Sequence, residues 1–229
     1  NDWAGTTTIN KDNQTSGLLI ASNNSIPTDS QVTIGTGRLH LAPGVSQTIA
    51  KLSSSSSNAI IRISYIDSNT LGRLTINQSA NTTFAGVIKG HGQIVKGGTG
   101  NLTLSGSNTY IGGTVINRGT IILGAAGVLA DKGHVTLANT SGVALNLNGN
   151  NETIGGLEGG GTTGGNVILG SGNLTINNIR TRHRATHGTE YSGVISGSGS
   201  VTKTGAGRLK VSGANTYTGG TTVSAGMLM

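Results

Sequence analysis

The sequence predicts an all-β protein whose chain winds into a parallel β-helix, a single solenoid of roughly ten coils stacked about 4.8 Å apart. Three observations lead to this fold class. A long segment recurs 107 residues later, apolar and polar residues alternate in short runs, and glycine is abundant while aromatic residues are scarce. No run of about 11 or more residues keeps the 3.6-residue apolar period of a helix without a glycine interruption.

The internal repeat defines the organisation of the chain. From Phe84 the sequence reads FAGVIKGHGQIVKGGTGNLTLSGSNTYIGGTVINRGTII, and from Tyr191 it reads YSGVISGSGSVTKTGAGRLKVSGANTYTGGTTVSAGMLM, with 18 identities in 39 aligned positions. We therefore expect one β-helical domain over residues 1–229, with superunits 1–107 and 108–214 and a partial third unit over 215–229. Because the chain begins and ends inside a repeat, it is expected to belong to a longer polypeptide.

The repeated aromatic signature is interpreted as structural. Tyr110 and Tyr217 each precede a Gly-Gly-Thr string, and Trp3 stands at the corresponding place in the first unit. Glycine is suited to the corners of a solenoid, where the backbone takes a positive φ. We expect these strings to be corners and the three aromatic side chains to lie at the same azimuth.

Short strands are predicted wherever the apolar residues follow a period of two. Such runs have one face inward and one outward, and Gly, Asn or Ser bounds them. A barrel or a sandwich would also alternate, but the turns lack the two-residue Asn-Gly or Asp-Gly hairpin signal. The runs are Leu39-His40-Leu41, Leu74-Thr75-Ile76, Leu102-Thr103-Leu104, Leu145-Asn146-Leu147, Leu174-Thr175-Ile176 and Leu209-Lys210-Val211.

Composition limits what can hold the chain together and what it can bind. The 229 residues include 40 glycines, six aromatic residues and no cysteine, so stability must come from backbone ladders and stacked aliphatic side chains rather than disulfides. No apolar run approaches the ~18 residues that span a bilayer, so membrane insertion is not expected. The net charge of +7 attracts polyanions, although nucleic acid is not among the expected partners.

The repeated strings resemble the autotransporter-associated β-strand repeat of passenger domains in Gram-negative bacteria (type V secretion). The matching pattern is an aromatic residue, Ser/Ala, Gly-Val-Ile, Gly-x-Gly, Lys-x-Gly-x-Gly, and Leu-x-Leu/Val-Ser-Gly-x-Asn-Thr-Tyr-x-Gly-Gly-Thr. The resemblance implies a right-handed β-helix that crosses the outer membrane through a C-terminal translocator barrel of the full-length protein. It also implies that the passenger is displayed on the cell surface or released.

The best candidate for a binding site is a basic window near the C-terminal end. Six basic residues and one acid, Glu190, give it a net charge of +5, which leaves +2 for the rest of the chain. Loops on a regular scaffold commonly carry binding, and alternating arginines in an extended segment share one face. A solvated loop that keeps the rod soluble explains the window equally well. The basic residues are Arg180, Arg182, Arg184, Lys203, Arg208 and Lys210.

Catalytic and metal-binding interpretations find little support. No Gly-x-Ser-x-Gly nucleophile string is present, the few carboxylates are scattered, and the Gly-x-Gly strings are not followed by Lys-Ser/Thr. His183 and His187 are four residues apart but lie in an inserted segment with only Glu190 nearby, so they are interpreted as solvated loop residues. No enzyme activity, cofactor or metal is expected.

Two functions remain open from the sequence. The first is a surface-displayed or secreted virulence factor that binds host cells through a receptor or a polyanionic glycan, as an adhesin or a released ligand. The resemblance adds that some short passengers are shed and act as pro-angiogenic mitogens. The alternative is a structural stalk that presents another domain, and a hydrolase is the least favoured reading.

Overall fold

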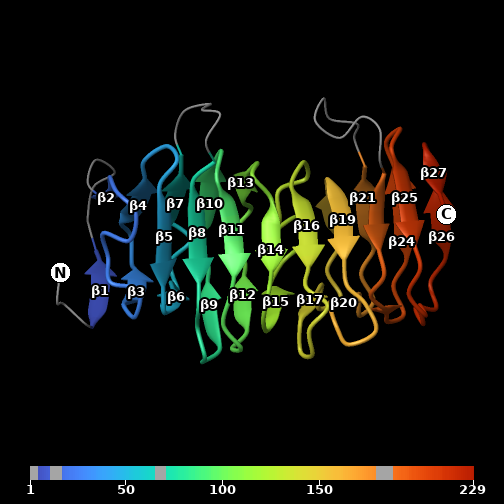
Figure 1. The fold of residues 1–229 in the computed structure, drawn as a ribbon, viewed down its shortest axis with the longest axis horizontal. Coiled ribbons are helices and arrows are strands. Elements are labelled where there is room, and N and C mark those ends of the chain that lie inside the picture. Colours follow the sequence, from blue (N-terminus) through green and yellow to red (C-terminus); the bar gives the residue numbers. More distant parts are fainter. Residues whose placement is uncertain (1–4, 11–16, 65–70, 179–187) are drawn as a thin grey trace.

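The computed structural model describes residues 5–10, 17–64, 71–178 and 188–229, and within these ranges it contains strands and no helix. Every strand pair in the described residues is parallel. The strands stack into an elongated solenoid of about nine turns (Figure 1). The predicted all-β, parallel β-helical architecture is confirmed. In the same ranges no helix is long and apolar enough to cross a membrane.

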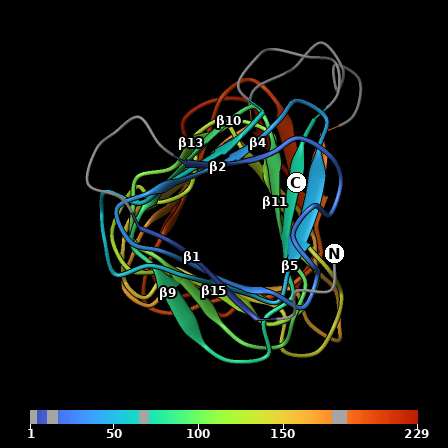
Figure 2. The same ribbon diagram turned by 90° about the vertical axis from the view of Figure 1, so that its left-hand side faces the viewer.

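Each turn of the solenoid passes through three sides, which give the roughly triangular cross-section in Figure 2. The first side holds a five-stranded sheet, β2 (Gly17–Ile20), β4 (Arg38–Leu41), β7 (Ile60–Ile63), β10 (Val87–Gly90) and β13 (Thr109–Tyr110). It continues as a four-stranded sheet, β18 (Glu152–Ile154), β21 (Leu174–Asn177), β24 (Val201–Thr204) and β26 (Thr221–Val223). Along the chain, strands of both sheets follow the third side and precede the second side. The two sheets therefore occupy the same side of the solenoid.

The second side is one nine-stranded sheet that runs along most of the rod. Its strands are β5 (Ser46–Ile49), β8 (Arg73–Ile76), β11 (Gln93–Lys96), β14 (Thr114–Ile116), β16 (His134–Leu137), β19 (Gly156–Gly159), β22 (Thr189–Tyr191), β25 (Arg208–Val211) and β27 (Met227–Leu228).

The third side begins with a three-stranded sheet and continues as a six-stranded one. The first contains β1 (Thr6–Ile9), β3 (Gln31–Ile34) and β6 (Lys51–Ser53). The second contains β9 (Thr82–Phe84), β12 (Leu102–Leu104), β15 (Thr120–Leu123), β17 (Ala144–Asn146), β20 (Asn166–Ile168) and β23 (Ile195–Ser196).

Alternation along each short strand fills a narrow interior with aliphatic side chains. In β8, Leu74 and Ile76 are fully buried while Arg73 and Thr75 face outward. Parallel pairing in register repeats the inward position from turn to turn, so Ile76 stacks directly on Ile49. Full burial of such a side chain contributes about 1.5–3 kcal/mol. The predicted period-two rows therefore line the core.

The 107-residue repeat does not span a whole number of turns. Strand β11 of the first copy lies on the second side, whereas its counterpart β24 lies on the first side. Likewise β12 lies on the third side and its counterpart β25 on the second. Equivalent segments are thus shifted by one side of the triangle. The expected common azimuth for the aromatic residues is wrong: Tyr110 is in β13, while the backbone beside Tyr217 bonds to β23. Trp3 lies outside the described residues.

The Asn-Thr-Tyr-x-Gly-Gly-Thr signature forms a corner that joins neighbouring turns, as expected. The Asn108 side chain accepts a hydrogen bond from the Ile88 amide (2.7 Å) and donates one to the Val128 carbonyl (2.8 Å). The Tyr110 hydroxyl lies 2.5 Å from that of Thr114. Gly113 has a φ of +86°, which a residue with a side chain rarely adopts. The signature is therefore explained by local structure.

Two lysines of the repeat occupy positions inside the aliphatic rows. Lys96 is fully buried and stands in register between Ile76 and Ile116. Its ammonium donates hydrogen bonds to the carbonyls of Gly98 and Arg118, which belong to successive turns. Burial lowers the pKa of Lys96 to about 8. The alkyl stem fills the core, and the charged end ties a corner of one turn to the next.

Replacing Lys96 with Ala is expected to lower the free energy of unfolding by about 3 kcal/mol, since the core loses a long stem and two carbonyls lose a donor. Denaturant titration followed by circular dichroism measures this change. The matched control is Lys132→Ala at an exposed position, which should stay within about 0.5 kcal/mol of the parent. Equal effects of the two substitutions would contradict the role of Lys96 in joining successive turns.

A buried carboxylate occupies a place that an amide occupies in the other unit. Gln47 is buried, accepts a hydrogen bond from the Ile26 amide (3.1 Å) and donates one to the Ile26 carbonyl (2.7 Å). Glu152, its counterpart, accepts hydrogen bonds from the amides of Val128 (2.8 Å) and Thr153 (3.1 Å). Burial raises the pKa of Glu152 to about 7, although these amides oppose the shift.

The raised pKa predicts a pH dependence of stability with a definite sign. Between about 4.5 and 7 the folded protein holds the Glu152 proton more tightly than the unfolded chain, so stability from this residue falls as pH rises. The decline amounts to about 3 kcal/mol for a shift of this size. Glu152→Gln should remove that slope in denaturant titrations at several pH values. Glu190→Gln, at an exposed site, should retain it, and a slope unchanged by Glu152→Gln would refute the assignment.

Candidate functional site

The predicted basic window is only partly within the described residues. Arg180, Arg182 and Arg184 lie outside them, as do His183 and His187. Arg208 and Lys210 lie on β25, where they alternate with the buried Leu209 and are both exposed. The structure thus places two of the six predicted residues together on the outside of the rod.

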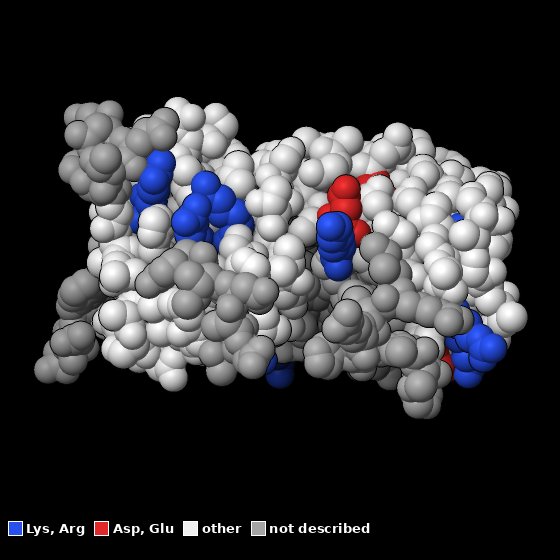
Figure 3. Space-filling view, turned by 90° about the horizontal axis from the view of Figure 1, so that it is seen from above, with Lys and Arg blue, Asp and Glu red and all other residues white. Residues whose placement is uncertain are grey.

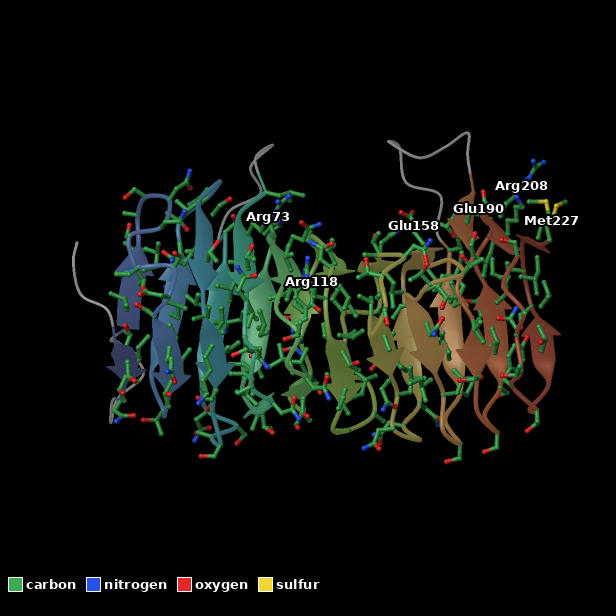
Figure 4. All side chains as sticks on the ribbon, turned by 60° about the horizontal axis from the view of Figure 1, so that its bottom comes forward. Arg73, Arg118, Glu158, Glu190, Arg208 and Met227 are labelled. Atoms are coloured by element: carbon green, nitrogen blue, oxygen red, sulfur yellow. The ribbon has the colours of Figure 1, made fainter. Side chains whose placement is uncertain are left out.

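The exposed part of this window is partly neutralised. The Lys210 ammonium lies 2.7 Å from a carboxylate oxygen of Glu190, in register on the neighbouring strand β22. Arg208 pairs in register with Met227, an exposed apolar residue, and Figure 4 shows both at the C-terminal end of the rod. Arg208 and Met227 therefore form a small mixed surface of one cation and one apolar side chain.

Lys203 has a different environment from that expected of a surface residue. It is fully buried on β24, in register with Ile176, at the position that Lys96 holds in the other unit. Its ammonium donates hydrogen bonds to the carbonyls of Thr204 (2.5 Å), Gly205 (2.8 Å) and Ala225 (3.3 Å). Burial lowers its pKa. The expectation that Lys203 joins an exposed patch is corrected, because the inward position of the strand directs its side chain into the core.

The three glutamates, all within the described residues, are engaged separately. Glu152 is buried beneath backbone amides, Glu158 lies 3.2 Å from the His134 ring, and Glu190 pairs with Lys210. Within the described ranges no three His, Cys, Asp or Glu side chains are grouped so that they could hold a metal ion. The arrangement of these residues therefore offers ion pairing and packing.

A second basic group, which sequence reasoning missed, lies on the first side of the rod. We define the basic row as Arg38, His40, Arg62 and Lys89, from β4, β7 and β10. His40 is in register with Arg62, and Arg62 with Lys89. The three strands that carry these residues are about one turn apart in sequence, so a linear charge window cannot detect the row. The signal that could have found them is cations recurring once per turn at outward positions.

Repulsion between the cations of the basic row contributes to lowered pKa values of two of its members. Burial, followed by the charges of Arg62 and Arg38, lowers the pKa of the Lys89 ammonium. Burial and then the charges of Arg62, Arg38 and Lys89 lower the pKa of the His40 imidazole. Figure 3 shows blue side chains gathered on the N-terminal half of this face. The row therefore concentrates positive charge on neighbouring strands of one sheet.

These features define a class of protein, the parallel β-solenoid. It is built here from a long internal repeat, with its polar residues on three flat outer sides. A passenger-associated transport repeat matches residues 94–123 and 201–229, which overlap the two copies that begin at Phe84 and Tyr191. The adhesin BmaC autotransporter of Brucella suis biovar 1 (strain 1330) is 39% identical over 159 residues. That match covers 69% of this chain and 4% of the relative. No solved structure matches the chain at a significant level.

These matches support an autotransporter passenger region built from such repeats. Such a region is exported across the outer membrane and is either secreted or displayed at the cell surface. The relative is far longer than this chain, so its adhesive activity is a property of that protein.

Proposed function

We propose that this passenger region is an adhesin-type module that binds host cells through a cell-surface receptor or a polyanionic glycan. The observation that carries the proposal is the 39% identity to an adhesin autotransporter over 69% of the chain. The fold is consistent with this role, because its core is filled with aliphatic rows and its polar residues stand on flat outer sides. Export would use a C-terminal translocator barrel of the full-length protein.

The basic window supplies the first candidate contact surface in this proposal. Arg208 is exposed in register with Met227, and arginine and methionine are both enriched in protein interfaces. Arg180, Arg182 and Arg184 would add charge from outside the described residues. A released passenger would act as a soluble ligand of a host receptor, and a pro-angiogenic mitogen is one such activity.

Purified passenger is expected to bind cultured host cells, and the double variant R208Q/K210Q should bind several-fold more weakly because rim cations raise the association rate. Flow cytometry with labelled protein, with and without soluble heparin, measures this binding. The triple variant R180A/R182A/R184A tests the remaining part of the window in the same assay.

The matched control is R73Q/R118Q, which removes the same charge from exposed positions elsewhere on the rod (Figure 4). It should bind cells as the parent does. If the parent itself fails to bind any host cell, the stalk function replaces the adhesive one. If all three variants lose binding equally, the window is not the contact surface.

A further inference from the structure

The basic row lies along the rod axis on one continuous parallel sheet. His40, Arg62 and Lys89 occupy outward positions on three successive strands in register. Successive side chains are therefore about 4.8 Å apart, the spacing of hydrogen-bonded strands. Thr109 of β13 continues the same line, since it pairs in register with Lys89. The row thus presents regularly spaced donors to a ligand that runs parallel to the axis.

The charges of Arg62 and Lys89 are not balanced within the described protein. Neither side chain forms an ion pair with any carboxylate in the described ranges, whereas Lys210 does. The Nε2 atom of His40, which is in register with Arg62, has no hydrogen-bond partner in those ranges either. Holding like charges this close lowers stability unless a bound anion offsets the repulsion.

An open depression adjoins the two cations. It has a volume of about 310 Å³ and is lined by Arg62, Lys89, Gly90, His91, Thr109 and Ile111. This volume is at the lower end of the range for small-molecule sites. The lining combines two cations and a threonine with Ile111, which is 52% exposed. The depression therefore offers both cationic and apolar side chains.

A second depression continues the first along the rod. It has a volume of about 370 Å³, shares Thr109 and Ile111 with the first, and extends to Asp131 and Lys132 on the next turn. Its chemistry is different, because one carboxylate, Asp131, and one ammonium, Lys132, line it together. Hydroxyl groups, which both donate and accept hydrogen bonds, suit this mixed surface.

We propose that the basic row and the two depressions form a binding site for a linear anionic glycan. An oxyanion of the glycan sits between Arg62 and Lys89. The adjoining sugar ring lies over Ile111, and its hydroxyl groups reach Thr109 and Asp131. This inference deepens the proposed function by naming the class of ligand and a site separate from Arg208 and Lys210.

The arrangement favours a glycan over other polyanions for two reasons. Arg62 and Lys89 suit an oxyanion, and the surface beyond them offers an exposed aliphatic side chain, one acid and one further cation, Lys132, instead of a continuous run of cations. A nucleic acid carries a phosphate at every step and would meet Asp131. The described lining contains no tyrosine, tryptophan or phenylalanine on which a base could stack. A glycan alternates charged groups with hydroxyls and apolar ring faces, as this surface requires.

The test measures direct binding of size-defined hexasaccharides by isothermal titration calorimetry at low salt. A heparin hexasaccharide and a hyaluronan hexasaccharide separate sulfate from carboxylate recognition, and binding of either one supports the site. The double variant R62Q/K89Q should bind about tenfold more weakly, while the control R73Q/R118Q should match the parent. The parent should bind single-stranded DNA of equal charge more weakly than the preferred hexasaccharide.

The melting temperature of the variant shows whether it folds and also tests the proposal. Because the parent holds like charges together, R62Q/K89Q should melt at the same temperature as the parent or higher at low salt. Binding of neither hexasaccharide, equal losses in both double variants, or equal binding of DNA would overturn the inference. The cell assay keeps the two proposals apart. Binding of hexasaccharide without binding of cells supports this site and removes the adhesive function, and the reverse result removes this site alone.

Discussion

The parallel, in-register pairing of each turn with the next is the interaction on which the whole structure depends. Strands of two to four residues are too short to be stable alone, and they persist because each one bonds to equivalents before and after it. Register also brings each inward side chain onto the one below, as Ile76 sits on Ile49. The backbone ladder and the aliphatic core therefore depend on the same register. A shift of one residue in that register would turn the aliphatic rows outward.

The same pairing explains how polar residues enter the interior without disrupting it. Lys96, Lys203, Gln47 and Glu152 all stand at inward positions, and each directs its polar end to backbone groups at a corner. At the corners, the backbone leaves the strand ladder, and its amides and carbonyls need other hydrogen-bond partners. Long side chains with an apolar stem are suited to this task, since the stem completes the row while the end satisfies the corner.

The fold could be read from the sequence because its causes are local and repeated. Leu74-Thr75-Ile76 alternates in the sequence as it does in the structure, and the Asn-Thr-Tyr signature forms the expected corner. The direction of Lys203 could not be read in this way, since its motif does not reveal which lysine faces inward. The row formed by Arg62 and Lys89 was equally hidden, because it depends on the number of residues in each turn. That number varies with the inserted loops, so only coordinates bring such residues together.

The offset of the repeat by one side has a consequence for any array of such units. A motif that recurs every 107 residues returns to the same side of the rod only after three copies. Features attached at one repeat position would therefore spiral around the rod instead of lining one edge. A rod decorated in this way can meet a neighbouring surface whatever its rotation about its own long axis. Display no longer requires that the rod be held at a fixed angle to the cell that carries it.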